Sequence, residues 1–204
     1  MNFKAYDILS SLVPGFIVLM VLLNFVNIEY NKDWLIPYTA FAFLLGFVIN
    51  TVSCWLEDIY YCTWGGKPSN RLLDGKSIWK VRFYEYQKVK SLLLNEVSTD
   101  NPSNDQLFAI AMRYANGKKD SRVDDFNANY ALSRAILTTV LISTILMLIK
   151  NYNDWRVYAI TLPILFGVWL RCKQRAYYYA REILNEYHKQ KSALSQYKTM
   201  IIIP

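Results

Sequence analysis

Two long uncharged runs near the N-terminus constrain the fold of this chain more than any other feature. Asp, Glu, Lys and Arg are absent from the 21 residues between Asp7 and Glu29, and from the 23 residues between Asp33 and Glu57. A helix of roughly 20 predominantly apolar residues crosses the hydrocarbon core of a bilayer. We therefore predict two transmembrane helices, which the short linker Glu29–Asp33 joins as an antiparallel hairpin.

A second pair of apolar runs is shorter. Arg134 and Lys150 bracket 15 uncharged residues, and Arg156 and Arg171 bracket 14. Lys and Arg side chains can extend along a helix and place their charges at the interface, which lengthens the usable span. These runs predict a second transmembrane hairpin; the alternative is a hairpin buried within protein or inserted part-way.

Charged and apolar residues are segregated along the chain. Hydrophobic residues make up 53% of it and the mean hydropathy is +0.10, yet the net charge is +7. Eleven Lys and Arg residues lie in segment 57–133 and seven in the tail from Arg171, whereas the linkers inside the hairpins hold one and two. Because basic segments stay on the cytoplasmic side, both termini and the central segment are predicted to be cytoplasmic.

The central segment has helical periodicity. Apolar residues recur at intervals of 4, 3, 3 and 4 at Trp79, Phe83, Tyr86, Val89 and Leu93, which predicts one amphipathic helix. Ser103 and Gln106 form a capping box that predicts a second helix, ending at Gly117. Ser121 and Asp124 predict the start of a third helix, which runs into the third span.

The tail predicts a helix that continues the fourth span. Its apolar residues keep a near-heptad spacing, interrupted by Gln190, at Ala176, Ala180, Ile183, Tyr187, Leu194 and Tyr197. The predicted fold is thus an all-α polytopic membrane protein. Its parts are a first transmembrane hairpin at 8–56, a cytoplasmic helical segment at 57–130, a second hairpin at 131–171 and a cytoplasmic basic tail helix at 172–204.

Two consecutive glycines, Gly65 and Gly66, follow the second span and are followed by Lys67. The stretch does not match a phosphate-binding P-loop, because Pro68 stands where that motif has a hydroxyl residue. Two glycines could present amide groups to an anion such as a lipid headgroup. The alternative, which we favour, is a turn that leaves the membrane.

Arg181 and His188, the single histidine, have the spacing of the Arg–His signature of HEPN ribonucleases. Histidine could act as acid or base, and arginine could bind the scissile phosphate. With nine arginines in the chain, the spacing is a common coincidence, so we favour a solvated histidine and predict no enzyme. Tyr178, flanked by Arg175 and Arg181, fits either RNA or lipid headgroups, which leaves direct nucleic acid binding open.

Acidic residues are absent from the spans, which argues against an ion-coupled carrier. Gly15, Gly46 and Gly167 permit close helix packing, and the hydroxyl residues of the spans favour helix association or, in an oligomer, a pore. One histidine and three cysteines offer little material for a metal site, so no cofactor is predicted. The predicted partners are the lipid bilayer and further copies of the chain.

The order of these segments carries a resemblance. An apolar hairpin is followed by a basic helical segment that opens after Val48–Asp58, then by a second hairpin and a basic tail. This layout resembles the small four-span membrane proteins encoded beside bacterial antiviral systems, and most of all the accessory proteins of type VI-B CRISPR loci.

The resemblance implies a bacterial inner-membrane protein in anti-phage defence, which either perturbs the membrane or modulates a cytoplasmic RNA-guided nuclease. The alternatives are a membrane-tethered ribonuclease that uses Arg181 and His188, or a structural or regulatory subunit of a membrane complex. The candidate interaction surface comprises Arg175, Tyr178, Arg181, Ile183, Tyr187, Gly65, Gly66 and Lys67.

Overall fold

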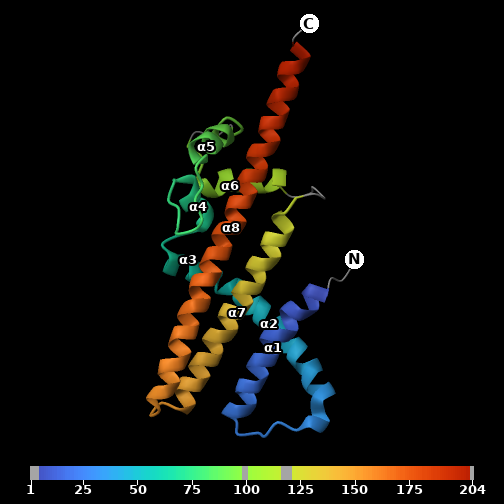
Figure 1. Cartoon of the computed structure of the whole chain (residues 1–204), viewed down its shortest axis with the longest axis vertical. Coiled ribbons are helices and arrows are strands. Elements are labelled where there is room, and N and C mark those ends of the chain that lie inside the picture. The colour runs from blue at the N-terminus through green and yellow to red at the C-terminus, as the bar shows by residue number, and fades with distance from the viewer. Residues whose placement is uncertain (1–4, 98–100, 116–120, 203–204) are drawn as a thin grey trace. The chain divides into compact units, whose positions relative to one another are not determined.

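The computed structural model describes residues 5–97, 101–115 and 121–202, with the side chains of residues 10–97, 101–115 and 121–194. Every regular element within these ranges is a helix, so the all-α prediction is confirmed. The elements are α1 (Ala5–Phe25), a 3-10 turn η1 (Lys32–Trp34), α2 (Leu35–Trp55), α3 (Glu57–Trp64), α4 (Pro68–Leu73), α5 (Tyr86–Leu94), α6 (Asn104–Ala115), α7 (Val123–Lys150) and α8 (Trp155–Ile202) (Figure 1).

The chain forms two compact units, which we describe separately. One comprises Met1–Tyr60 and Ala131–Cys172, and the other comprises Tyr61–Tyr130 and Lys173–Pro204. The first unit contains six basic and six acidic residues, and we call it the apolar unit. The second contains seventeen basic and ten acidic residues, and we call it the basic unit. The whole net charge of +7 therefore belongs to the basic unit.

In the apolar unit, α1 and α2 meet at a pair of buried glycines. A Cβ atom added at Gly15 would lie 1.8 Å from the carbonyl oxygen of Ala42, and one at Gly46 would lie 1.8 Å from that of Ser11. Only glycine lets two helix backbones approach this closely. The predicted packing role of both glycines is confirmed. Gly167 differs, because an added Cβ there would meet no atom within 4 Å.

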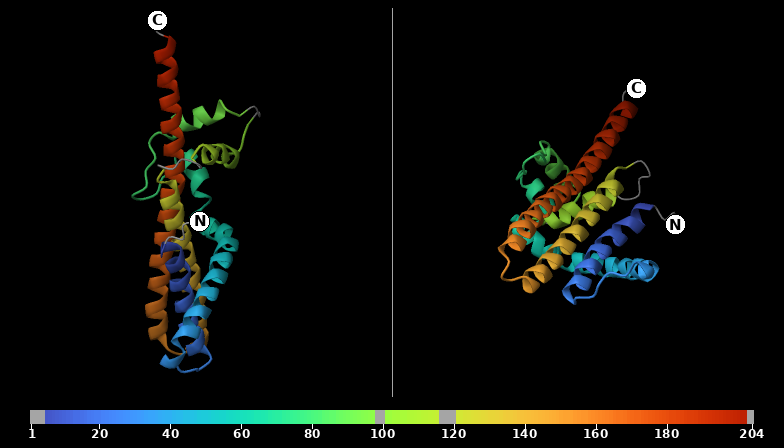
Figure 2. Two further views of the ribbon diagram at one scale, coloured as in Figure 1. Left: turned by 90° about the vertical axis from the view of Figure 1, so that its right-hand side faces the viewer. Right: turned by 60° about the horizontal axis from the view of Figure 1, so that its bottom comes forward.

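Further contacts tie α7 to this hairpin. Val18 of α1, Ile49 of α2 and Ala135 of α7 form a buried apolar cluster. At the end of α1, Asn27 takes a positive φ of 58°, and the amine of Lys150 donates to the carbonyl oxygen of Asn24 and to Oδ1 of Asn27. A cation that binds the last carbonyls of a helix stabilises its C-terminus. Both figures of the ribbon show α7 and the first part of α8 side by side and antiparallel (Figures 1 and 2).

Among the described residues, two helices are long and apolar enough to cross a membrane, within Lys32–Trp55 and Val123–Lys150. The described apolar part of α1, Ser10–Phe25, is shorter. The sequence favoured the first hairpin over the second, whereas the structure supplies one such helix from each. The reason is length: α7 begins eleven residues before Arg134 and reaches 28 residues.

The basic unit has a conventional hydrophobic core. Its fifteen buried members come from α4, α5, α6, α7, α8 and the segment between α4 and α5. They are Leu72, Leu73, Val81, Phe83, Val89, Leu93, Leu107, Ala111, Ala115, Val123, Tyr177, Ala180, Ile183, Leu184 and Tyr187. The part of α8 after Cys172 thus supplies five of these fifteen residues, and the tail is an integral part of this unit.

Two predicted helix starts are confirmed. The Ser103 amide donates to Oε1 of Gln106 at 2.9 Å, and the Gln106 amide donates to the Ser103 hydroxyl at 3.3 Å, which is the predicted capping box. Ser121 accepts from the Val123 amide at the start of α7. Gly117, the predicted end of the second helix, and the side chain of Tyr197 lie outside the described residues.

The helix predicted from Trp79 onward is wrong at its beginning. α5 begins only at Tyr86, and residues before it form a turn in which the Val81 amide donates to the Ile78 carbonyl at 3.0 Å. Lys80 within this turn has a φ of +69°, a conformation that ends any helix. Trp79 is 84% exposed, whereas the later members of the predicted face are buried or partly buried.

Candidate interaction surface

Two residues of the predicted interaction surface are not on the surface. Ile183 and Tyr187 are fully buried in the core of the basic unit. The near-heptad face of the tail, which could have paired with another helix, instead packs on α4, α5 and α6 of the same chain. The periodicity indicates a helix contact, and the partner of this contact lies within the same chain.

A polar network surrounds this buried face of α8. Glu96 accepts from the Tyr187 hydroxyl at 2.9 Å and pairs with the amine of Lys191 at 2.5 Å. The hydrogen bond to Glu96 raises the pKa of Lys191, and burial, then the contact with Glu96, raises the pKa of Tyr187. Gln190, the polar interruption of the heptad pattern, donates to the carbonyl oxygen of Tyr114 at 3.0 Å. These bonds fix the rotation of α8 against α5 and α6.

The glycine pair after α3 forms a helix cap. The Gly66 amide donates to the Tyr61 carbonyl at 2.9 Å and the Gly65 amide to the Cys62 carbonyl at 3.2 Å, with both glycines at positive φ. This is the Schellman arrangement of a helix C-terminus. Both amides are used within the chain, so the anion cradle considered from the sequence is not formed. Lys67 pairs with Asp105 at 3.2 Å.

Cations and aromatic rings alternate across one part of the basic unit. The guanidinium of Arg181 lies 5.0 Å from the ring centroid of Tyr178, which packs on Phe126 at 6.3 Å, and Arg122 lies over Phe126 at 5.3 Å. The Tyr178 hydroxyl donates to the carbonyl oxygen of Lys80 at 3.4 Å. We call these five residues the cation–aromatic surface.

Sequence reasoning found Tyr178 and Arg181 on this surface but missed Arg122, Phe126 and Lys80. Arg122 directly precedes α7 and Phe126 lies in its first turn, at a spacing of four residues that could have revealed them. Lys80 was hidden because the apparent helix periodicity assigned its segment to α5. Arg175, also predicted, is partly exposed on α8.

His188 is less solvated than the sequence suggests. Its side chain is 14% exposed, its Nδ1 lies 2.8 Å from Oε2 of Glu85, and Nε2 lies 3.5 Å from the Ser192 hydroxyl. A carboxylate at this position orients the imidazole. Arg181, its partner in the Arg–His signature, stacks instead on Tyr178. Each residue therefore has a structural contact that accounts for its place on α8.

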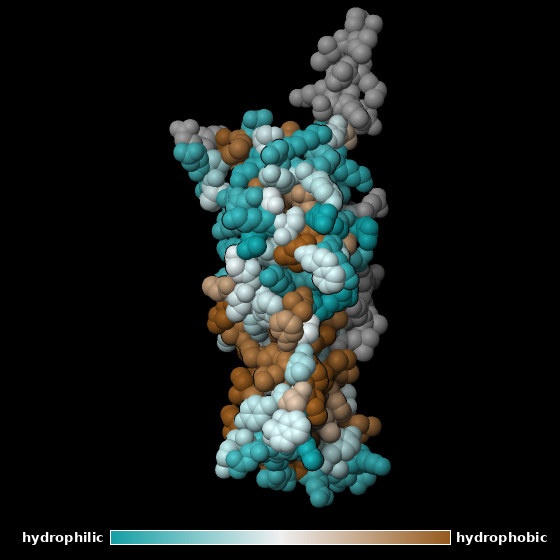
Figure 3. Space-filling view, turned by 60° about the vertical axis from the view of Figure 1, so that its left-hand side comes forward, coloured by the Kyte–Doolittle hydropathy of each residue, from teal (hydrophilic) through white to brown (hydrophobic). Residues whose placement is uncertain are grey.

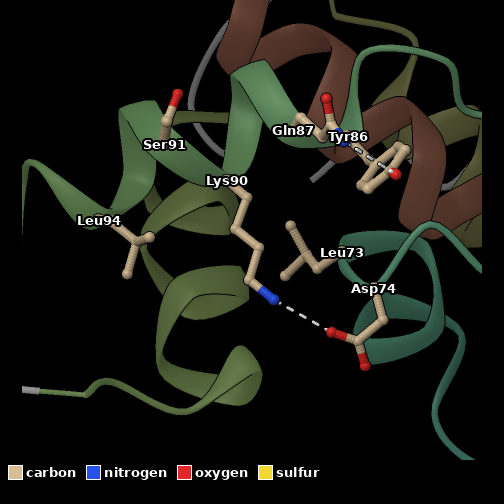
Figure 4. Close-up of a pocket in the computed structure, with 7 residues that line it drawn as sticks. All are labelled: Leu73, Asp74, Tyr86, Gln87, Lys90, Ser91 and Leu94. Carbon is tan, nitrogen blue, oxygen red and sulfur yellow. Dashed lines mark hydrogen bonds and ion pairs between the residues drawn. The ribbon is translucent and has the colours of Figure 1, made fainter.

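A shallow pocket of about 430 Å³ lies between α4 and α5, where Leu73 and Leu94 face Tyr86 and Lys90 (Figure 4). Lys90 pairs with Asp74 across it at 3.0 Å. Hydrogen bonds from Asn104 and Lys90 hold the pKa of Asp74 below its usual range. The two charges satisfy each other, so the pocket offers no unbalanced charge to a ligand.

Among the described side chains, no three His, Cys, Asp or Glu residues gather as the ligands of a metal ion would. Comparison with protein families, with curated proteins and with solved structures finds no match to this chain.

Proposed function

We propose that this chain is a small four-span membrane protein whose basic unit serves as a cytoplasmic docking module. One observation carries the proposal: the apolar helices expose their large hydrophobic side chains. Only 17% of the apolar stretch of α2 is buried, and 28% of that of α7. A core helix of a water-soluble protein would bury most of such a stretch, because exposed apolar patches of this size mark interaction with lipid or protein.

The exposed residues of α2 surround the helix except where α1 and α7 pack on it. Phe47 is 66% exposed and Leu44 is 61% exposed, whereas the buried positions are Ala42, Gly46, Ile49 and Ser53. Apart from Ile49, small residues lie inside and large apolar residues outside, which is the pattern of a helix that packs in lipid. Figure 3 shows hydrophobic side chains gathered on the surface of the apolar unit.

The other two spans in this proposal are α1 and the first part of α8. α1 packs on α2 through its glycine crossing, so lipid around α2 would also surround α1. Exposed apolar residues on α8 include Ile160, Ile164 and Phe166. The positive-inside rule places the seventeen basic residues of the basic unit, and both termini, in the cytoplasm.

The role we propose is that of an accessory or effector protein of the bacterial inner membrane, acting in anti-phage defence without catalysis. The resemblance of segment order supports defence, and the cation–aromatic surface supports docking of an acidic partner. Such a partner could be a cytoplasmic nuclease or another protein. Assembly of several copies through the apolar unit belongs to the same proposal.

Topology is tested by reporter fusions in the bacterial membrane. Reporters at Asn101 and after residue 204 should report the cytoplasm, and reporters at Lys32 and Asp154 should report the opposite side. Alkaline carbonate should leave the protein in the membrane pellet. A cytoplasmic reporter at Asp154 would remove the second hairpin from the membrane and reduce the span count to two.

The docking role is tested by phage protection, together with entry of a normally excluded dye, in cells that carry the neighbouring defence genes. The double change Arg122→Glu and Arg181→Glu should abolish both effects, because it reverses the charge of the cation–aromatic surface. Lys88→Glu and Lys189→Glu, at two exposed sites of the same unit, provide the matched control and should retain them.

His188→Asn separates docking from RNA cleavage. The Asn amide can replace the hydrogen bond from Nδ1 to Glu85 but cannot exchange protons near neutral pH. Protection should survive this change. Loss of protection, with the protein still in the membrane and the dye still excluded, would favour the ribonuclease and overturn the docking proposal.

A further inference from the structure

The turn between α4 and α5 presents aromatic and basic side chains from a fixed base. Val81 is fully buried and Phe83 is 6% exposed, while Trp79 and Tyr84 are 84% and 78% exposed. The Ile78–Val81 hydrogen bond closes the turn, and the Tyr178 hydroxyl binds the Lys80 carbonyl. The two inward anchors, Val81 and Phe83, therefore lie between the two outward rings, Trp79 and Tyr84.

Cations accompany both exposed rings. The amine of Lys80 lies 4.6 Å from the ring centroid of Trp79, and Arg82 Nη1 lies 3.5 Å from the Tyr84 hydroxyl. Lys76 is also exposed nearby in the sequence, and Glu85, the acidic residue that follows, faces His188. The turn thus combines two exposed rings with a positive charge.

Lys80 adopts a backbone conformation that is unfavourable for lysine. Its φ of +69° belongs to the left-handed region, which glycine adopts without strain and a residue with a Cβ does not. Strained residues cluster at sites where the side chain has a role. At this position the side chain places an ammonium group beside the most exposed tryptophan of the described residues.

We propose that residues 76–84 form a binding site for the headgroups of anionic phospholipids. Lys80 and Arg82 bind the phosphates, and Trp79 and Tyr84 enter the interfacial layer, where these two residue types are enriched. The inference rests on the proposed membrane location and adds to it a specific lipid class and a specific site.

One observation favours a lipid surface over single-stranded nucleic acid. The basic unit is joined to the apolar unit at three points of the chain, after Tyr60, Tyr130 and Cys172. If the apolar unit lies in the bilayer, the lipid surface is present at high effective concentration.

The experiment uses the full-length protein in nanodiscs made of phosphatidylcholine alone or mixed with phosphatidylglycerol. Some of the lipids carry bromine atoms near the headgroup, which quench nearby tryptophans. The chain has six tryptophans, so the signal of Trp79 is the difference between the parent protein and Trp79→Phe. We expect this difference signal to be quenched in the anionic discs and to recover in high salt.

Charge reversal identifies the site. Removing one cation from an anionic lipid surface weakens binding about fivefold, so Lys80→Glu with Arg82→Glu should abolish quenching of Trp79. The matched pair Lys88→Glu and Lys189→Glu should leave it unchanged. Equal loss in both pairs would mean that overall charge, and not this turn, holds the lipid, and would overturn the inference.

Other outcomes overturn the inference in distinguishable ways. Equal quenching in both kinds of disc would exclude recognition of anionic headgroups. An unquenched Trp79 whose emission responds to single-stranded RNA would identify a nucleic acid site. A protein that stays soluble without detergent and enters no disc would contradict the proposed membrane function itself.

Discussion

The apolar unit and the basic unit obey opposite rules of residue placement. In the apolar unit, the large hydrophobic side chains of α2 other than Ile49 are mostly exposed, and the small residues Ala42, Gly46 and Ser53 face inward. In the basic unit, Leu72, Val89 and Ile183 are fully buried and the charged residues lie outside. The first unit is electrically neutral, and the second carries the whole net charge.

This difference shows how one chain adapts to two surroundings. In water, burial of apolar area drives folding, so the basic unit needs a core. Between helices in lipid this driving force is missing, and close backbone packing takes its place. A glycine crossing therefore holds the helices of one unit together, as a leucine-rich core does in the other. Substitutions in each unit test this comparison.

The largest effect is expected in the core of the basic unit. Ile183→Asp places a charge without a partner at a fully buried position, which should destabilise this unit by at least about 4 kcal/mol. Leu194→Asp, on the same helix at a 54% exposed position, should change stability by less than about 0.5 kcal/mol. Urea unfolding of the detergent-solubilised protein measures both. Equal effects would mean that α8 does not pack on the core.

In the apolar unit, the strongest effect is expected at the helix crossing. Gly46→Leu forces a side chain into the backbone of α1, at a cost of about 3 kcal/mol, because neither helix can move aside without losing its partner. Gly167→Leu is the control, since nothing lies within 4 Å of an added Cβ there. Thermal stability in detergent compares the two. A tolerated Gly46→Leu would place the crossing elsewhere.

Substitution of an exposed residue tests directly whether lipid surrounds the apolar unit. Leu44 lies near the middle of α2 and is 61% exposed. In lipid, Leu44→Asp should cost about 2.5–3.5 kcal/mol of insertion and leave a fraction of the protein outside the membrane. Leu94→Asp, at a 43% exposed position of the basic unit, should leave insertion unchanged. Full insertion of both variants would mean that Leu44 faces water or protein and not lipid.

The smallest effect is expected at the strained turn of the basic unit. Here the substitution should raise stability, whereas the preceding substitutions should lower it. Lys80→Gly should stabilise this unit by about 0.5–1 kcal/mol, because glycine adopts a positive φ without steric strain. Lys88→Gly, within α5, should instead destabilise it by up to about 1 kcal/mol. Hydrogen exchange of the core amides resolves changes of this size. A destabilising Lys80→Gly would show that the side chain itself supports the fold.

Much of the helical structure could be predicted, because its signals are local. The Ser103–Gln106 capping box and the Ser121 cap involve residues two or three positions apart. The start of α5 could not be found in this way, since Trp79 and Phe83 continue the helical spacing by coincidence. The turn at Lys80 lacks the glycine or asparagine that normally reveals a positive φ.

The candidate surface was only partly predictable for a different reason. Tyr178 and Arg181 are neighbours on α8, so sequence alone could group them. Phe126 lies more than fifty residues earlier and joins them only because α7 and α8 pack together within the basic unit. Contacts between distant segments depend on side-chain packing, which no local pattern encodes.

The sequence by itself determined the helical class, the separation of apolar from basic segments and the helix caps, because periodicity, composition and short-range hydrogen bonds are local properties. Only the tertiary structure decided what each helix face meets. The spacing of Ile183 and Tyr187 predicted a surface for another helix, but both residues are buried in the core of their own unit. A hydrophobic stripe specifies that something must cover it, and the free energy of packing the whole chain selects which segment does so.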